Sequence, residues 1–524
     1  MHCLSRRFVS FVSSHLAPVM QFRVGLISRP GARPSRLFDF GQPIKIAQHL
    51  DGAEAILSGN ATPNFGLRKP GYTLILAGLG ALTGNMSWSA IAANYAFLAF
   101  LPVAAYGIGF SLRGRSAGWL AALLTMAHLQ TALWAGRIMS EASYTCFATF
   151  GILLVAIGLS RPRMGRWMFA AGTLLAGAWL IRSVALSVIV AALVCICFGL
   201  RRSPRRAVAT CALLLLPVIG AVALECGLNY QTAGRFRTST SALGIMLQTR
   251  ARYLQRSPFP DTETNRWFLD LLPERSPEDA YRANKLDGCI ARCRAIRGGG
   301  MDEWEFNARI TRSGLETLAA DPMNTLTTGL VVFFRHLFRY SGGPSASRVA
   351  VDRRSPIIVH EAAIDFQDSQ DNWFAYWILP HRSLKESTES VARMWVAADE
   401  RAPFGGSDIW RVIRYAASLP VVVEVLNILR AVGSLWPGFA LILCGLLGLN
   451  RRICALLALS YVLDAVIIGI CGSTDIANHR YQFIWLATDA ALVACLVTRA
   501  VEAAAGCLAG LVRVFRPTDP HLVQ

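Results

Sequence analysis

Long apolar runs separated by short polar turns follow one another along most of this chain. The runs lie near residues 86 to 112, 117 to 138, 141 to 160, 167 to 182, 183 to 200, 207 to 228, 436 to 450, 453 to 472 and 481 to 500. Most of them approach the ~20 residues that an α-helix needs to cross a bilayer. The pattern therefore predicts an all-α polytopic membrane protein.

A further apolar stretch, Phe8 to Ser28, lies near the start of the chain and follows Arg6 and Arg7. A secretory signal is the alternative interpretation, but no clear small-residue cleavage site follows the stretch. We therefore expect it to span, with the two arginines holding its start in the cytosol. It brings the expected number of crossings to about ten, which leaves both ends of the chain cytoplasmic.

Basic residues occupy every second turn between the runs. Arginines lie at 113 and 115, at 161 to 166, at 201 to 206 and at 451 and 452, whereas the turns between them carry Glu141, Arg182 and the stretch His479 to Tyr481. Short loops rich in Lys and Arg stay in the cytosol. The alternation predicts a multi-pass protein of a plasma membrane, such as a bacterial inner membrane, with the other polar turns on the extracytoplasmic face.

Composition agrees with a membrane location. The chain of 524 residues is 53% hydrophobic and 16% charged, with a mean hydropathy of +0.40, which is more apolar surface than an ordinary soluble core hides. Much of its net charge of +19 lies in the turns beside the runs and at the termini, where anionic lipid headgroups are sufficient partners. We expect the lipid bilayer, and not nucleic acid, to be the partner of these charges.

The region from about 229 to 417 differs from the rest, because it carries charges, prolines and only short amphipathic stretches such as Thr328 to Tyr340. Loops of this length are usually functional or partly folded. We expect three parts: an N-terminal transmembrane module at 1–228 that includes a first outer loop at 29–85, an extracytoplasmic domain at 229–417, and C-terminal helices with a cytoplasmic tail at 418–524.

Several short polar motifs lie in the turns assigned to the outer face. In the first outer loop, Asp39 begins a polar stretch, and Arg68-Lys69-Pro70-Gly71-Tyr72 precedes an apolar run. Ser140-Glu141 and Arg182 lie at the outer ends of later runs, and His479-Arg480-Tyr481 comes late in the chain. In order and placement, the set resembles the GT-C class glycosyltransferases that use polyprenyl-phosphate sugars. That group includes protein mannosyltransferases and the lipid A aminoarabinose and galacturonic acid transferases.

The resemblance implies a GT-C-like fold and transfer of a sugar from a polyprenyl-phosphate donor to an acceptor on an envelope glycolipid, a glycan or a protein. It implies that Asp39 is the catalytic base. Asp51, with Glu54 close by in the sequence, is the alternative base, because Pro43 occupies the position where the family usually has Tyr. Glu141 matches the family's second acidic position.

A sugar linked through phosphate to a lipid is already activated, so the enzyme mainly has to remove a proton from the acceptor and stabilise the leaving phosphate. A carboxylate base contributes ~10²- to 10⁴-fold to such a reaction, and cations stabilise the charge on the leaving oxygen. Arginine donates two parallel hydrogen bonds to a phosphate, whereas lysine acts as a point charge. The expected donor phosphate-binding residues are Arg68, Lys69, Arg182 and the Arg480-Tyr481 pair, which matches the family's late Arg-Tyr pair.

Some of these residues have other interpretations. Glu141 is placed to interact with the amides of a helix N-terminus, and Arg182 and Arg480 are placed to reach lipid headgroups. Asp464 and Asp489 lie within apolar runs, where an ionisable group is either functional or hydrogen-bonded to a neighbouring helix. No tight His and Cys spacing predicts a metal site. Because members of the family differ in their use of a divalent ion, the resemblance leaves a metal cofactor open.

Two other classes of protein fit part of the pattern. A transporter of lipid-linked sugars needs charges along a path through the membrane, which Asp464 and Asp489 provide in part. A polysaccharide polymerase or ligase also has many membrane helices and a large outer loop, but needs no acidic base in its first loop. The outer acidic residues, the Arg480-Tyr481 pair and the one-sided layout favour the glycosyltransferase.

Overall fold

The computed structural model describes residues 43–59, 69–127, 140–161, 164–239, 247, 261–271, 300–338, 437–447, 449–471 and 485–514. The chain divides into two compact units, Met1–Pro43 and Ile44–Gln524. All the described residues after Pro43 belong to the second unit.

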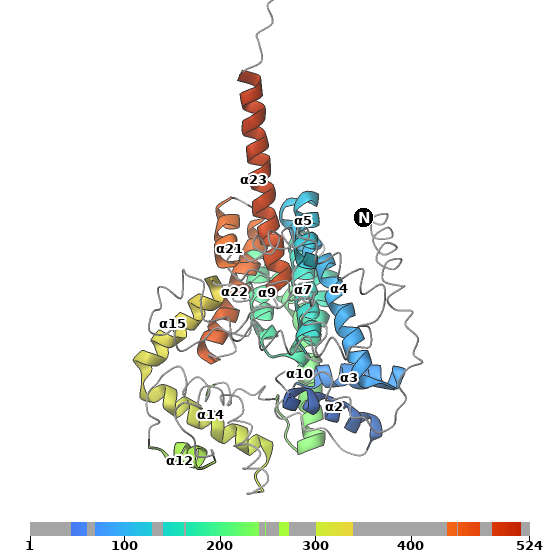
Figure 1. The fold of residues 1–524 in the computed structure, drawn as a ribbon, viewed down its shortest axis with the longest axis vertical. Coiled ribbons are helices and arrows are strands. Elements are labelled where there is room, and N and C mark those ends of the chain that lie inside the picture. The colour runs from blue at the N-terminus through green and yellow to red at the C-terminus, as the bar shows by residue number, and fades with distance from the viewer. Residues whose placement is uncertain are drawn as a thin grey trace, which may run out of the picture. The chain divides into compact units, whose positions relative to one another are not determined.

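In these ranges the chain forms α-helices and no strand (Figure 1). The helices are α2 (Pro43–Ser58), α3 (Pro70–Thr83), α4 (Met86–Arg113), α5 (Arg115–Ala127), α7 (Glu141–Leu159), α8 (Gly165–Ile181), α9 (Ala185–Gly199), α10 (Pro204–Ala233), α12 (Glu263–Asp270), α14 (Glu303–Ala320), α15 (Pro322–Phe338), α21 (Pro437–Leu446), α22 (Arg451–Cys471) and α23 (Leu486–Val514). Each apolar run that falls on described residues forms a helix, so the predicted all-α class is confirmed. The segment Phe8 to Ser28 lies outside the described residues.

Five of the described helices are long and apolar enough to cross a membrane: Ala92–Arg113 in α4, Glu141–Leu159 in α7, Pro204–Ala233 in α10, Arg451–Ile470 in α22 and Leu486–Gly510 in α23. Two further helices, Pro70–Thr83 and Ala185–Gly199, are apolar but shorter. These helices indicate an α-helical membrane protein. The count of about ten crossings stays a prediction.

The basic turns meet at one end of these helices, which we call the basic end. There, Arg452 Nη1 at the start of α22 donates a hydrogen bond to the carbonyl of Leu159 at the end of α7 (2.9 Å). Arg113 at the end of α4 forms an ion pair with Glu502 of α23. Successive helices therefore alternate in direction, and the first residue of α7 and the last turn of α8 lie at the opposite end.

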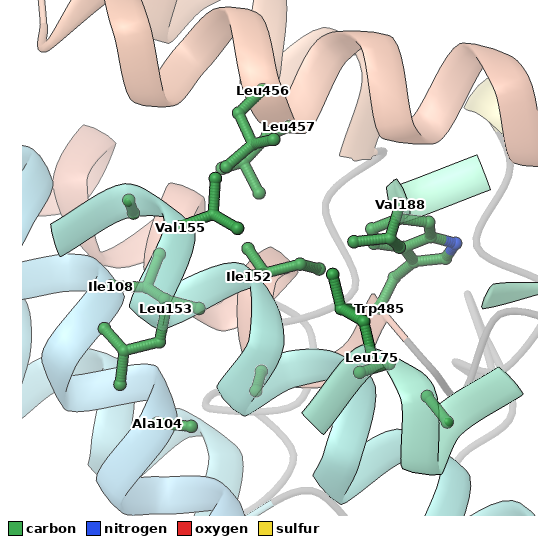
Figure 2. Close-up of a cluster of buried hydrophobic side chains, with 14 of the residues drawn as sticks. Ala104, Ile108, Ile152, Leu153, Val155, Leu175, Val188, Leu456, Leu457 and Trp485 are labelled. Atoms are coloured by element: carbon green, nitrogen blue, oxygen red, sulfur yellow. The ribbon is translucent and has the colours of Figure 1, made fainter. Parts of the chain in front are cut away.

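Helix α7 occupies the centre of the main hydrophobic core. It contacts α4, α8, α9 and α22, and most of its side chains are buried. Figure 2 shows Val155 of α7 directed toward Leu456 and Leu457 of α22, and Ile152 of α7 beside Leu175 of α8. A helix that is apolar on all sides is suited to such a central position.

Helices α8 and α10 cross at very close range. A Cβ on Gly172 of α8 would lie 2.2 Å from the carbonyl oxygen of Leu214 in α10, so only glycine fits there without a shift of backbone. This crossing holds the end of α8 beside the later part of α10. Near the end opposite the basic end, Trp179 of α8 donates a hydrogen bond to Glu225 of α10. The close crossing therefore helps to hold these two residues together.

Three helices are described in the polar region that was expected at 229–417. Thr262 and Asp302 cap α12 and α14 by accepting backbone hydrogen bonds from Asn265 (3.2 Å) and Glu305 (2.7 Å). α15 covers most of the predicted amphipathic stretch and packs against α22.

The expected division of the chain into three parts stays a prediction. The boundary expected at 228 falls inside α10, which continues to Ala233, and the boundary expected at 417 lies outside the described residues.

Substitution of Gly172 by alanine tests the close crossing of α8 and α10. We expect Gly172→Ala to destabilise the protein by about 1–3 kcal/mol, because the added methyl group forces the two backbones apart. The matched control is Gly220→Ala in α10, where a Cβ meets nothing within 4 Å. That control should be neutral or slightly stabilising, since alanine favours helix. Thermal unfolding of both purified variants measures the difference, and equal melting temperatures would contradict the crossing.

Candidate functional site

A buried ion pair joins the start of α3 to α10. Lys69, the residue before α3, places its Nζ 2.7 Å from Oε2 of Glu225, and the two side chains are 2% and 0% exposed. Removing two charges from water costs several kcal/mol per ion unless geometry and further hydrogen bonds compensate. Burial lowers the pKa of Lys69, and the adjacent Glu225 carboxylate opposes this shift.

The Glu225 carboxylate accepts hydrogen bonds from three separate parts of the chain. Its Oε2 also accepts from Nε1 of Trp179 at the end of α8 (3.1 Å). Its Oε1 accepts from the backbone N–H and the hydroxyl of Ser239 (2.8 and 2.7 Å). The Lys69 ammonium lies 3.9 Å from the centre of the Trp179 ring, which adds a cation–π contact. Both carboxylate oxygens of Glu225 are therefore fully engaged.

The segment that supplies Ser239 folds back along the end of α10. Asn229 Nδ2, one turn after Glu225, donates a hydrogen bond to the Arg237 carbonyl (2.6 Å). The Arg237 guanidinium lies 4.1 Å from the centre of the Trp304 ring in α14. These contacts tie the polar region to the same end of α10 that carries Glu225.

A second ion pair joins α7 to α8. Arg182 Nη2 donates to Oε1 of Glu141 at 3.0 Å, with the two side chains 16% and 1% exposed. Glu141 is the first residue of α7, and Arg182 follows the last residue of α8. The positive end of one helix dipole therefore meets the carboxylate, and the negative end of the other meets the guanidinium. The helix-end interpretation of Glu141 and its pairing with Arg182 are thus compatible.

Two tyrosines border the Glu141–Arg182 pair. Tyr144 lies one turn after Glu141, and the Arg182 guanidinium is 6.0 Å from the centre of its ring. Tyr72, three residues after Lys69, is buried near Glu141.

The two ion pairs are neighbours because α3 begins against the end of α8. A Cβ on Gly71 would lie 2.7 Å from the backbone carbon of Leu180, so glycine permits this contact. Trp179 and Arg182 are three residues apart at the end of α8; Trp179 donates a hydrogen bond to Glu225 of the first pair, and Arg182 is a member of the second. We call the set Lys69, Tyr72, Glu141, Tyr144, Trp179, Arg182 and Glu225 the candidate site.

The structure brings together Lys69, Glu141 and Arg182 of the residues predicted from the sequence. Asp51 lies on α2, but its side chain is outside the described part of the chain. The other predicted site residues also lie outside it; they are Asp39, Arg68, Arg480 and Tyr481.

Sequence reasoning missed Glu225. It lies within the apolar run at 207 to 228, and an ionisable residue in such a run is a signal of function or of a buried partner. The same signal singled out Asp464 and Asp489, so it was available for Glu225. The partner could not be read from the sequence, because Lys69 lies 156 positions away.

The two buried aspartates differ in their surroundings. Asp464 of α22 accepts a hydrogen bond from Nε1 of Trp485 (2.7 Å), and the Trp485 ring stacks on Tyr461 at 4.3 Å. This agrees with the interpretation of Asp464 as a residue hydrogen-bonded to a neighbouring helix. Asp489 in the first turn of α23 is 2% exposed, and its carboxylate has no hydrogen-bond partner among the described residues.

Among the described residues, no three His, Cys, Asp or Glu side chains gather closely enough to hold a metal ion. The helices indicate an α-helical membrane protein, and the two buried ion pairs form a polar centre at one end of its bundle. Comparison with protein-family models, with curated proteins and with solved structures found no match for this chain.

Removal of one partner tests the buried pair of Lys69 and Glu225. We expect Lys69→Met to destabilise the protein by about 3–5 kcal/mol, because it leaves the Glu225 carboxylate buried without its cation. The double variant Lys69→Met/Glu225→Gln should recover most of this loss, since no isolated charge remains. Thermal unfolding in detergent measures both effects.

The matched control for that comparison is Glu305→Gln, because Glu305 pairs with Arg309 in α14 and the two side chains are 46% and 47% exposed. An exposed pair contributes about 0–1 kcal/mol, so the control should barely change the melting temperature. If the double variant is no more stable than Lys69→Met alone, the unpaired Glu225 carboxylate is not the cause of the loss.

Proposed function

We propose that this protein is a membrane glycosyltransferase that moves a sugar from a polyprenyl-phosphate donor to an acceptor. The observation that carries the proposal is the pairing of Glu141 with Arg182 beside Lys69, where α3, α7 and α8 meet at one end of the bundle. These three residues come from separate motifs of the sequence. Their convergence is expected for one site and is not required by helix formation.

Arg182 is the cation best placed for the donor phosphate. Its side chain is 16% exposed, whereas that of Lys69 is 2% exposed and engaged by Glu225. A guanidinium has five N–H donors in a planar fork, a geometry that suits both a carboxylate such as Glu141 and a phosphate. Glu141 orients this fork, and the Lys69–Glu225 pair is joined to the same end of α8 through Trp179.

The proposed reaction is a single displacement at the anomeric carbon of the sugar. The acceptor oxygen forms a bond to that carbon while the bond from the carbon to the phosphate oxygen breaks. The acceptor proton passes to a carboxylate base, for which Asp39 is proposed and Asp51 is the alternative. The polyprenyl phosphate leaves with the bonding electron pair, and Arg182 with Arg480 stabilises the negative charge that develops on its oxygen.

The proposal includes a GT-C-like fold with about ten crossings and a site on the extracytoplasmic face. It is supported by the gathering of the basic turns at the end away from Glu141 and Arg182. A lipid-linked donor suits a site at the end of membrane helices, because its polyprenyl chain can stay in the bilayer while its sugar is in water. The acceptor, an envelope glycolipid, a glycan or a protein, is proposed to approach through the region 229–417.

A transporter of lipid-linked sugars is the second candidate. The observation in its favour is Asp489, a carboxylate buried in α23 that has no hydrogen-bond partner among the described residues. Ionisable groups inside membrane segments often belong to proton or substrate pathways. A transporter would translocate the donor and leave its sugar uncleaved, so the two candidates differ in the product.

Transfer of radiolabelled sugar from a panel of polyprenyl-phosphate sugars, in membranes that contain the protein, tests the proposed reaction. We expect label to move to an acceptor, and Asp39→Asn or Asp51→Asn to abolish the transfer, depending on which carboxylate is the base. Label that crosses the membrane on an intact donor would instead favour the transporter. If both variants transfer sugar as well as the wild type does, neither Asp39 nor Asp51 is the catalytic base.

The role of Arg182 is tested by Arg182→Lys. Lysine cannot bridge Glu141 and a phosphate with a planar fork, so we expect kcat/KM for the donor to fall about 10²- to 10³-fold. Arg113→Lys is the matched control, because Arg113 is also a mostly buried arginine in an ion pair, but at the basic end. If both variants lose activity equally, the loss reflects stability and Arg182 has no special part in catalysis.

The proposed orientation is tested by labelling of single cysteines from outside intact cells, in a background without native cysteines. Arg312→Cys in α14 should react with an impermeant reagent, and Arg205→Cys at the start of α10 should react only after permeabilisation, because the basic turns are cytosolic. Both positions are exposed in the structure. The opposite labelling pattern would place the site in the cytosol.

A further inference from the structure

Helix α15 carries large apolar side chains on its surface. Met323, Leu326 and Leu330 are 71%, 57% and 46% exposed. Their spacing of three and four residues places them on one face of the helix. A row of large apolar side chains on a surface marks a contact with something apolar.

The neighbouring face of α15 packs against a helix that can span a membrane. A Cβ on Gly469 of α22 would lie 3.1 Å from the Gly329 carbonyl oxygen and 3.4 Å from Cβ of Phe333. Gly469 is close to the end of α22, away from the basic turns. Leu326 and Gly329 are three residues apart, as are Leu330 and Phe333. The exposed row therefore adjoins the face that contacts α22.

Helix α22 has an exposed apolar row of its own. Val462, Val466 and Ile470 are 38%, 38% and 59% exposed and repeat every four residues. In a membrane-spanning helix, such a row is the surface that faces lipid. Because α15 packs at the same part of α22, lipid in contact with this row would also reach α15.

The polar groups near the exposed row of α15 agree with an apolar environment. Thr327, which is exposed beside Met323, donates its hydroxyl hydrogen to the Met323 carbonyl (2.8 Å). Thr325 donates to the carbonyl of Leu318 in α14 (2.6 Å). A hydroxyl that donates to a backbone carbonyl needs no water partner, so these threonines are tolerated beside lipid.

We propose that α15 lies in the bilayer, with Met323, Leu326 and Leu330 against the acyl chains of the leaflet at the end opposite the basic turns. The region expected to form an extracytoplasmic domain thus returns part of its chain to the membrane. α14 then ends at the membrane surface, where Asp321 separates it from α15. This inference is independent of the proposed reaction, because it rests on packing and exposure alone.

A fluorescent amino acid at position 326 of the full-length protein in liposomes tests the proposal. Brominated acyl chains quench a fluorophore that touches lipid, and aqueous iodide quenches one that faces water. We expect quenching at 326 by the brominated lipid and little quenching by iodide. The matched control is position 312 in α14, whose arginine side chain is 75% exposed, and there we expect the reverse pattern.

Quenching at 326 by iodide alone would overturn the proposal, because the helix would then face water. Quenching by neither agent would also overturn it, since another part of the chain or a second copy would then cover the row. The same probe at position 323 replaces the measurement if the protein with a substitution at 326 does not fold, as judged by size-exclusion chromatography.

Discussion

The cost of burying charge is the constraint on which the polar end of this protein depends. Lys69, Glu141, Arg182 and Glu225 are all largely removed from water, and each is engaged by an opposite charge. A buried charge that loses its partner is strongly destabilising. The starts of α3 and α7 and the ends of α8 and α10 are therefore held in register by electrostatics, within a bundle that is otherwise packed by apolar side chains.

Close contacts between backbones make this arrangement possible. Gly71 lets α3 begin against the end of α8, and Gly172 lets α8 cross α10. Membrane helices often associate through small residues in this way, because lipid gives little hydrophobic drive for their contact. The polar side chains could not reach one another if bulkier residues separated these helices. Packing and charge pairing at this end therefore depend on each other.

Glu225 also connects the polar centre to the rest of the protein. It receives Lys69 and Trp179 from the bundle and Ser239 from the segment that leads toward α14. A proposed acceptor that binds to the region 229–417 would thus act on a segment in direct contact with the candidate site. This gives a physical route by which the polar region and the membrane bundle can influence each other.

The sequence by itself determined the helices of the apolar runs, their approximate ends and their alternating direction, because apolar runs and basic turns are local signals. It also indicated Lys69, Glu141 and Arg182 as one set of polar residues. Only the tertiary structure decided that Lys69 pairs with Glu225 and that Arg182 pairs with Glu141. Partners that lie 156 and 41 positions apart meet only when the helices pack, and no local pattern encodes which residues face each other.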